Sequence, residues 1–260
     1  MDVKAWAGHP VGRLFSPRAT LRRIAYDFFL SRQCDGCGAD LHQDDPGTLC
    51  WDCRARLPLM TAPVCEVCGD YVNGLAGEGF VCEACRKGRP AYDWARSAMH
   101  YDGGVREVVR ALKYGQRFVC IEEMALWMLT AWTDSTRPPT PVPPTVATGV
   151  PMAYGRERVR GYNQAHLLAA EVARGLGIDF QPKLLRRVRA TDSQTRMTAR
   201  QRRLNVKGVF AAGRAKAVAG ASVLLVDDVM TTGATLAECA AALKAAGAAH
   251  VYCLTAARGG

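Results

Sequence analysis

Residues 223–235 read Val-Leu-Leu-Val-Asp-Asp-Val-Met-Thr-Thr-Gly-Ala-Thr, and they predict a buried strand followed by a turn and a helix. Its first four residues are apolar without polar alternation, which is typical of a central parallel strand buried on both faces. The alanine-rich segment 234–246 follows at once and predicts a helix that ends at Gly247. A strand leading directly into a helix favours an α/β fold, in which helices cover a parallel sheet.

The same stretch offers groups that bind a sugar phosphate. If the strand ends at Val226, Asp227 and Asp228 lie at the carboxyl edge of the sheet, where ligands bind in open parallel sheets. The small and hydroxyl residues that follow lead into a helix N-terminus, whose unpaired N–H groups form a cradle for phosphate. The two carboxylates would repel a phosphate but accept hydrogen bonds from a sugar diol. A ribose 5-phosphate therefore fits better than the alternative, an ordinary turn whose acids cap the helix.

Outside residues 223–246, apolar patterns predict the other strands of the sheet and its helices. We expect strands at 95–101, 146–150, 184–188 and 251–256, and helices at 105–112, 122–131 and 162–176. Five prolines in 137–144 predict an extended surface loop. We divide the chain into an N-terminal lead with a short helix (1–33), a cysteine-rich module (34–88) and the α/β domain (90–260).

Eight of the eleven cysteines form four Cys-x-x-Cys pairs, a pattern that more often holds zinc than disulfides in a chain without a secretory signal. Two pairs make one closed tetrahedral site of four thiolates, so we expect two structural zinc ions. The sequential scheme joins the first pair with the second and the third with the fourth, and a crossed scheme would also satisfy every thiolate. The expected ligands are Cys34, Cys37, Cys50, Cys53, Cys65, Cys68, Cys82 and Cys85. The remaining three, Cys120, Cys239 and Cys253, we interpret as small core residues.

The positive charge is concentrated in one segment. Residues 183–216 contain eleven basic residues and one acidic residue, which equals the net charge of +10 of the whole chain. A local excess of this size indicates a polyanionic substrate or partner. No stretch approaches the roughly 18 apolar residues of a membrane helix, so we expect a cytoplasmic protein without membrane insertion.

Residues 223–235 closely resemble the motif of the type I phosphoribosyltransferases, which binds phosphoribosyl pyrophosphate (PRPP). Three further stretches narrow the likeness: Ala-Leu-Lys-Tyr-Gly at 111–115, Arg-Gly-Tyr-Asn-Gln-Ala at 160–165, and Arg189-x-Thr191-x-x-Gln194. With the four cysteine pairs, they resemble the ComF family of competence-associated proteins from about Cys34 to the C-terminus. One departure is Met197, where the family pattern has leucine.

The resemblance implies a type I phosphoribosyltransferase fold and a role for each part of the site. Asp227 and Asp228 would hold the ribose hydroxyls, and Mg²⁺ would bridge the ribose and the pyrophosphate. The 5-phosphate would lie at Met230, Thr231, Thr232, Gly233, Ala234 and Thr235. The pyrophosphate would meet Arg156, Arg158 and Arg160 in a loop after residue 150. It would also meet Gln194, Arg200 and Arg203 in a mobile loop, residues 189–203, that covers the site.

The resemblance also implies a role in DNA uptake, with single-stranded DNA and a DNA-uptake helicase or other competence proteins as partners. Two alternatives stay open: an active phosphoribosyltransferase of nucleotide metabolism, and an adaptor that handles DNA without catalysing transfer. The basic segment suits pyrophosphate and a nucleic-acid backbone equally well.

Overall fold

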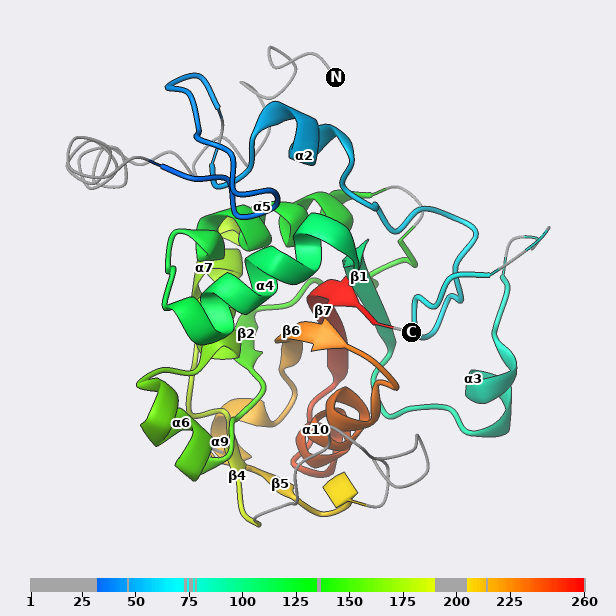
Figure 1. Ribbon diagram of the computed structural model, residues 1–260. Helices are drawn as coiled ribbons and strands as arrows, with labels where there is room; N and C mark the ends of the chain where they lie inside the picture. Colours follow the sequence, from blue (N-terminus) through cyan, green and yellow to red (C-terminus); the bar gives the residue numbers. More distant parts are fainter. Residues whose placement is uncertain are drawn as a thin grey trace.

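A five-stranded parallel sheet forms the centre of the molecule (Figure 1). The computed structural model describes residues 32–45, 47–72, 74, 77, 79–134, 137–189, 205–213 and 215–259. The strand order is β1-β7-β6-β2-β3. These strands are β1 (Trp94–His100), β2 (Val146–Gly149), β3 (Asp179–Phe180), β6 (Ser222–Met230) and β7 (His250–Arg258). The predicted parallel sheet is thus confirmed, with the strand of the 223–235 stretch at its centre.

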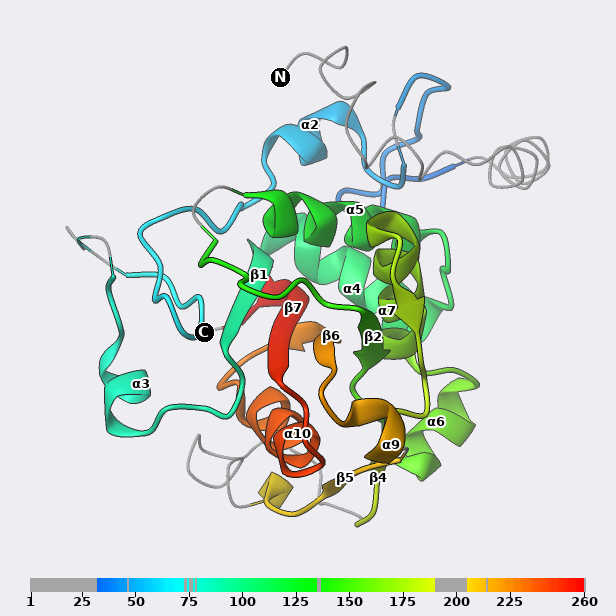
Figure 2. The ribbon, with the colours of Figure 1, turned by 180° about the vertical axis from the view of Figure 1, so that it is seen from behind.

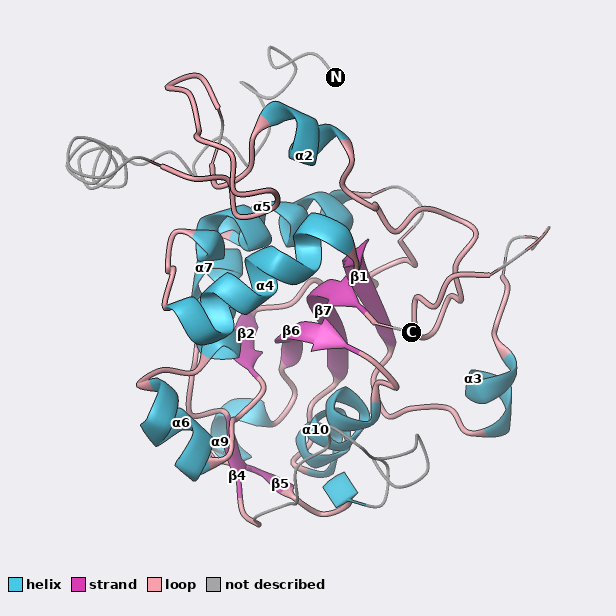
Figure 3. Ribbon diagram, in the orientation of Figure 1, coloured by secondary structure: helices cyan, strands magenta, loops and turns pink. Residues whose placement is uncertain are grey.

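Helices cover both faces of this sheet (Figures 2 and 3). Helices α4 (Gly103–Gly115), α5 (Cys120–Thr133) and α7 (Gln164–Leu176) lie on one face, and α10 (Ala234–Ala245) lies on the other. Side chains of β6 alternate between the two layers: Leu224 and Val226 pack toward α5 and α7, whereas Val223 and Leu225 pack toward α10. Burial on both faces explains why the strand lacks polar alternation.

Local signals set the helix ends. Asn163 caps α7, because its side-chain oxygen accepts from the backbone N–H of Ala165 at 3.0 Å, and Gly177 ends the helix in the left-handed conformation. The amphipathic pattern expected for 105–112 is confirmed in α4, whose buried residues are Val105, Val108, Val109 and Leu112.

Two expectations need correction. The predicted strand at 184–188 exists as β4 (Leu185–Arg187), but it pairs antiparallel with β5 (Phe210–Ala212) in a separate two-stranded sheet. This small sheet contacts α10, and the short helix α9 (Ala215–Val218) follows β5. The segment after residue 150, expected as a loop, contains helix α6 (Tyr154–Arg160), which ends at Gly161 with φ 82°. Neither β4 nor α6 is a long apolar element, so their structure depends on tertiary contacts and not on a hydrophobic period that the sequence would show.

The cysteine-rich module wraps around the helical layer and the β1 edge of the sheet. It contains two short helices, α2 (Trp51–Ala55) and α3 (Glu83–Lys87). In both views α2 lies over α5, and α3 lies on the β1 side of the sheet but set apart from that strand (Figures 1 and 2). Cys120, Cys239 and Cys253 are fully buried, as expected of core residues. The helix expected within 1–33 falls outside the described residues, and among those described no helix is long and apolar enough to cross a membrane.

Candidate functional site

The two adjacent carboxylates lie on a strand that is longer than expected. β6 does not end at Val226 but continues to Met230, because β7 extends beside it as far as the pair Met230–Arg258. On its other side β2 pairs with β6 only as far as Val226. From Asp227 onward one edge of β6 therefore has no neighbouring strand, and the two acids lie at that open edge.

The carboxylates face opposite layers. By strand alternation Asp227 points to the α10 side and Asp228 to the α4 side. Asp228 is 4% exposed and forms an ion pair with the ammonium of Lys113, near the end of α4. Asp227 is half-buried, and its Oδ1 accepts from the backbone N–H of Asp228 at 2.9 Å. The sequence predicted no role for Lys113, because a lysine near a helix end is ordinarily a solvated residue.

The pKa values of the two acids are driven apart. Burial, followed by repulsion from Asp228, raises the pKa of Asp227 well above its ordinary value. Burial acts the same way on Asp228, but the Lys113 ammonium outweighs it and lowers the pKa of Asp228. For Lys113 burial is likewise outweighed, by Asp228, and its pKa is raised. The surroundings thus favour the charged form of Asp228 and the protonated form of Asp227.

The turn after β6 exposes the N-terminus of α10. Gly233 precedes this helix with φ 72° and, as a glycine, offers no side chain to cap it. Thr232 Oγ1 accepts from the N–H of Ala234 at 3.4 Å, so this hydroxyl lies at the start of the helix. Ala234 and Thr235 begin the helix, where the N-terminal N–H groups and the positive dipole end favour an anion.

Glycine is required at position 233 by space as well as by conformation. A Cβ there would lie 2.5 Å from Met230 Cε and 3.3 Å from the Tyr92 hydroxyl. Met230, expected among the phosphate-binding residues, is the last residue of β6, and its side chain is buried beneath the turn. We call residues 230–235 the phosphate loop, after the role that the sequence predicts for them.

The arginines after β2 lie on α6, at the end of the sheet that carries the acids. Arg156 and Arg158 are exposed. Arg160 is held in place, since its Nη1 donates to Gln164 Oε1 at 2.6 Å and its guanidinium lies 5.5 Å from the centre of the Tyr114 ring. Gln194, Arg200 and Arg203 lie outside the described residues, in the segment that connects β4 to β5.

The eight paired cysteines form two clusters of four. Cys34, Cys37, Cys50 and Cys53 make ribbon 1, and Cys65, Cys68, Cys82 and Cys85 make ribbon 2; within each cluster all sulfurs lie within 4.8 Å of one another. The sequential pairing is confirmed, and the crossed scheme is excluded.

The cluster geometry fits zinc. Tetrahedral zinc with Zn–S bonds of about 2.3 Å needs sulfurs about 3.8 Å apart. The Sγ atoms of Cys37 and Cys50 are 3.8 Å apart, and those of Cys68 and Cys82 are 3.7 Å apart. Four thiolates leave no open position on the metal, so the two zinc-binding sites are structural.

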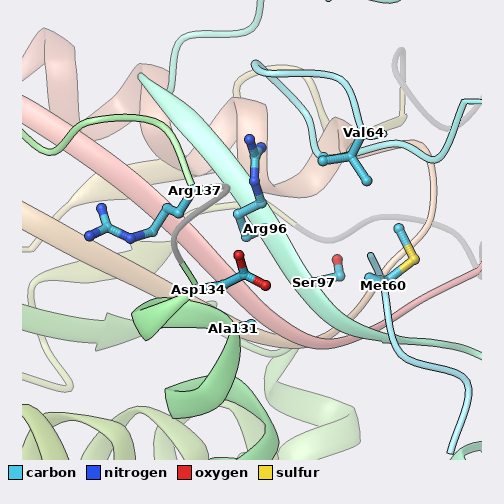
Figure 4. Close-up of a pocket in the computed structure, with 8 residues that line it drawn as sticks. Met60, Val64, Arg96, Ser97, Ala131, Asp134 and Arg137 are labelled. Atoms are coloured by element: carbon cyan, nitrogen blue, oxygen red, sulfur yellow. The ribbon is translucent and has the colours of Figure 1, made fainter. Parts of the chain in front are cut away.

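A small pocket lies apart from the carboxylates, between ribbon 2 and the outer face of β1 (Figure 4). It is lined by Met60, Val64, Gly69, Arg96, Ser97, Ala131, Asp134 and Arg137. Arg96 is 7% exposed, and its Nη1 donates to the carbonyl oxygens of Cys65 and Glu66, at 3.1 and 3.2 Å. The pocket's most buried cation therefore serves to hold ribbon 2.

Comparison with known proteins agrees with both halves of this description. A double zinc ribbon domain matches residues 25–88, and a phosphoribosyl transferase domain matches residues 163–260. Competence protein F of Haemophilus influenzae is 30% identical, over 86% of this chain and 95% of its own length. DNA utilization protein YhgH of Salmonella typhi is 34% identical, over 80% and 96%. Competence protein ComFC of Bacillus subtilis is 26% identical, over 72% and 74%. The chain therefore belongs to the ComF family, in which a double zinc ribbon precedes a phosphoribosyltransferase domain.

Proposed function

We propose that this chain binds PRPP together with Mg²⁺ at the carboxyl end of β6 and serves in the handling of single-stranded DNA in the cytoplasm. One observation carries the first half: two adjacent carboxylates at the open edge of β6 are followed within a few residues by a helix N-terminus whose N-cap residue, Gly233, has no side chain. Acceptors for a diol and donors for a phosphate are thus supplied by one continuous segment, Asp227 to Thr235. Few ligands other than a sugar phosphate present both partners at that spacing.

Each part of PRPP then has its own partner. Asp227 and Asp228 take the ribose hydroxyls, and the backbone N–H groups of the phosphate loop take the 5-phosphate. Arg156 and Arg158 are the exposed guanidinium groups for the pyrophosphate, while Arg160 orients the N-terminus of α7 through Gln164. The cover segment would add Gln194, Arg200 and Arg203. Mg²⁺ would neutralise the pyrophosphate next to the carboxylates, and Lys113 limits their mutual repulsion.

The chain divides into three parts along the sequence. Residues 34–88 form the zinc module, and the PRPP domain begins at about residue 90, because β1 belongs to the same sheet as β6. Residues 1–33 form the N-terminal lead.

The DNA-handling role rests on the names of the relatives and on one surface. Tyr114 and Tyr154 are 76% and 79% exposed, and Arg160 lies over the Tyr114 ring. Exposed aromatic rings beside guanidinium groups suit the bases and phosphates of a single strand. This surface favours a DNA-handling role, with or without transfer of the phosphoribosyl group, over a metabolic transferase whose acceptor is a free base.

Replacing both acids tests the proposed site. Calorimetric titration with PRPP and Mg²⁺ should give binding to the wild-type chain and none to Asp227→Asn/Asp228→Asn. The amides keep the size of the side chains but lose the charge, so circular dichroism should stay unchanged. PRPP affinity that survives in a folded double variant would place the ligand elsewhere.

A further inference from the structure

Ribbon 2 packs directly against β1, an edge strand of the sheet. The backbone N–H of Ala95 on β1 donates to the carbonyl of Val67 at 2.8 Å. A Cβ at Gly69 would lie 2.7 Å from the carbonyl oxygen of Ala95, so the two backbones are in close contact. Arg96 adds its donations to Cys65 and Glu66, and Figure 4 shows it on β1 beside the loop that carries Val64.

Arg258 joins ribbon 2 to the phosphate loop. It is the last residue of β7, opposite Met230 of β6, and only 8% exposed. Its Nη1 donates to the carbonyl of Cys68 at 2.8 Å, and its Nε donates to Asp70 Oδ1 at 2.8 Å. The same Nη1 lies 3.3 Å from the sulfur of Met230. One buried guanidinium therefore contacts both a zinc-ligand residue and the first residue of the phosphate loop.

Met230 passes this contact to the turn that holds the phosphate. Its methyl group leaves no space for a side chain at position 233, and its carbonyl accepts from Gly259 at 2.9 Å. Tyr92 closes the other side of Gly233, and it belongs to the same buried cluster as Met230, Cys65, Cys68 and Cys85. The turn thus rests on side chains that also touch ribbon 2.

Ribbon 1 has a different support. Its Cys34 and Leu49 pack into the cluster of α4 and α5. Arg54 forms a 2.7 Å ion pair with the buried Glu123 of α5, so this ribbon is held by the helical layer. The two zinc sites therefore differ in what they support.

We infer that Arg258 is a positioning residue that couples zinc-loaded ribbon 2 to the phosphate loop, so that PRPP affinity depends on zinc in ribbon 2 and not on zinc in ribbon 1. This inference rests on the proposed function. If the knuckle loses its metal, the Cys68 carbonyl no longer fixes the guanidinium, and Met230 loses its rigid support below Gly233. Because the coupling is a property of binding free energies, PRPP must in turn tighten zinc in ribbon 2.

Matched arginine variants test the first half. Arg258→Lys keeps the charge but loses the planar fork that reaches Cys68, Asp70 and Met230 together. We expect it to weaken PRPP binding roughly tenfold, within the usual range of coupling between sites, while metal analysis still gives two zinc ions. Arg54→Lys breaks the corresponding contact of ribbon 1. It should lower the unfolding temperature and change PRPP affinity by less than about twofold.

Zinc affinity provides a readout that a merely structural arginine would not change. Cys37→Ser leaves only the ribbon 2 site, and Cys82→Ser leaves only the ribbon 1 site. In equilibrium competition with a chelator, PRPP and Mg²⁺ should strengthen zinc binding roughly tenfold in Cys37→Ser and leave it unchanged in Cys82→Ser. Adding Arg258→Lys to Cys37→Ser should abolish the effect.

The outcomes separate this inference from the proposed function. Absence of PRPP binding by the wild-type chain refutes both. Normal binding by wild type and by Arg258→Lys, with zinc affinity insensitive to PRPP in Cys37→Ser, overturns the coupling alone. An equal response of the two single-site variants also overturns it, because ribbon 1 would then be coupled as strongly as ribbon 2.

Discussion

Replacing Lys113 by methionine should destabilise the protein through the carboxylates rather than through packing. The methionine keeps most of the length of the side chain, but it leaves the buried Asp228 without its counter-charge, next to the half-buried Asp227. Breaking a buried ion pair from one side costs about 3–5 kcal/mol. The Lys113 side chain is 21% exposed and that of Asp228 6%, and Asp228 can take up a proton. We therefore expect a loss of about 2 kcal/mol, below that range because of solvent and proton uptake.

The loss should depend on pH in a defined direction. Although burial opposes the charge, Lys113 lowers the folded pKa of Asp228, so the stabilisation is present above the unfolded carboxyl pKa and lost as the pH falls through the folded one. For Lys113, burial opposes the charge, but Asp228 outweighs it and raises the folded pKa. The stabilisation is therefore present below the unfolded lysine pKa and lost as the pH rises through the folded value. The difference from wild type should therefore be larger at pH 8 than in acid, where Asp228 takes up a proton.

Thermal unfolding followed by circular dichroism at pH 8 and at acidic pH measures this. A loss of about 2 kcal/mol corresponds to about 4–8 °C in a domain of this size. Lys244→Met is the matched control: Lys244 pairs with Asp93 at 2.9 Å, but both side chains are about one-third exposed, so its loss should cost about 0–1 kcal/mol. Adding Asp228→Asn to Lys113→Met should restore part of the stability. If Lys113→Met unfolds like Lys244→Met, or the double variant is no more stable than the single one, the ion pair of Lys113 with Asp228 does not stabilise the fold.

Four further results are expected. PRPP affinity should rise with pH and binding should release protons, since the raised pKa of Asp227, caused by burial and then by Asp228, keeps a proton that the ligand displaces; equal calorimetric heats in buffers of different ionisation enthalpy would exclude this. Gly149→Ala should lower stability by about 2 kcal/mol or more, because the new Cβ would lie 2.5 Å from the backbone of Ala165, whereas Gly155→Ala, with nothing within 4 Å, should be near neutral in urea titrations. Replacing Arg156 and Arg158 by alanine should reduce the salt slope of oligonucleotide binding by about 1.4, from about 0.7 per phosphate contact, in fluorescence anisotropy, and an unchanged slope would remove α6 from the DNA surface. Metal analysis of protein purified without chelators should give two zinc ions per chain, and a value of one would contradict the two clusters.

The elements that the sequence predicted best are those with a strong local pattern. The central strand, the end of α7 at Gly177 and the cysteine clusters all follow from local patterns, whereas the start of α7 was placed at Tyr162, two residues before Gln164. The end of β6 was placed too early, at Val226. Two acids normally end a strand, and only the long partner β7 carries the ladder on to Met230.

The missed parts of the site depend on contacts between distant segments. Lys113 and Asp228 are far apart in sequence, and nothing near Lys113 shows that its ammonium is directed to a carboxylate. The link from Cys68 through Arg258 to Met230 likewise joins three separate segments. The antiparallel pairing of β4 with β5 was missed because three-residue strands carry too little pattern to show their partner.

Titration of the full chain with PRPP in a calorimeter, with and without Mg²⁺, measures binding at the proposed site. Asp227 and Asp228 beside the phosphate loop predict one PRPP per chain and an affinity that falls sharply when Mg²⁺ is withdrawn. Ribose 5-phosphate, which keeps the diol and the 5-phosphate, should bind more weakly and with little dependence on Mg²⁺. Absence of PRPP binding in the presence of Mg²⁺, or equal affinity with and without the ion, would contradict the account.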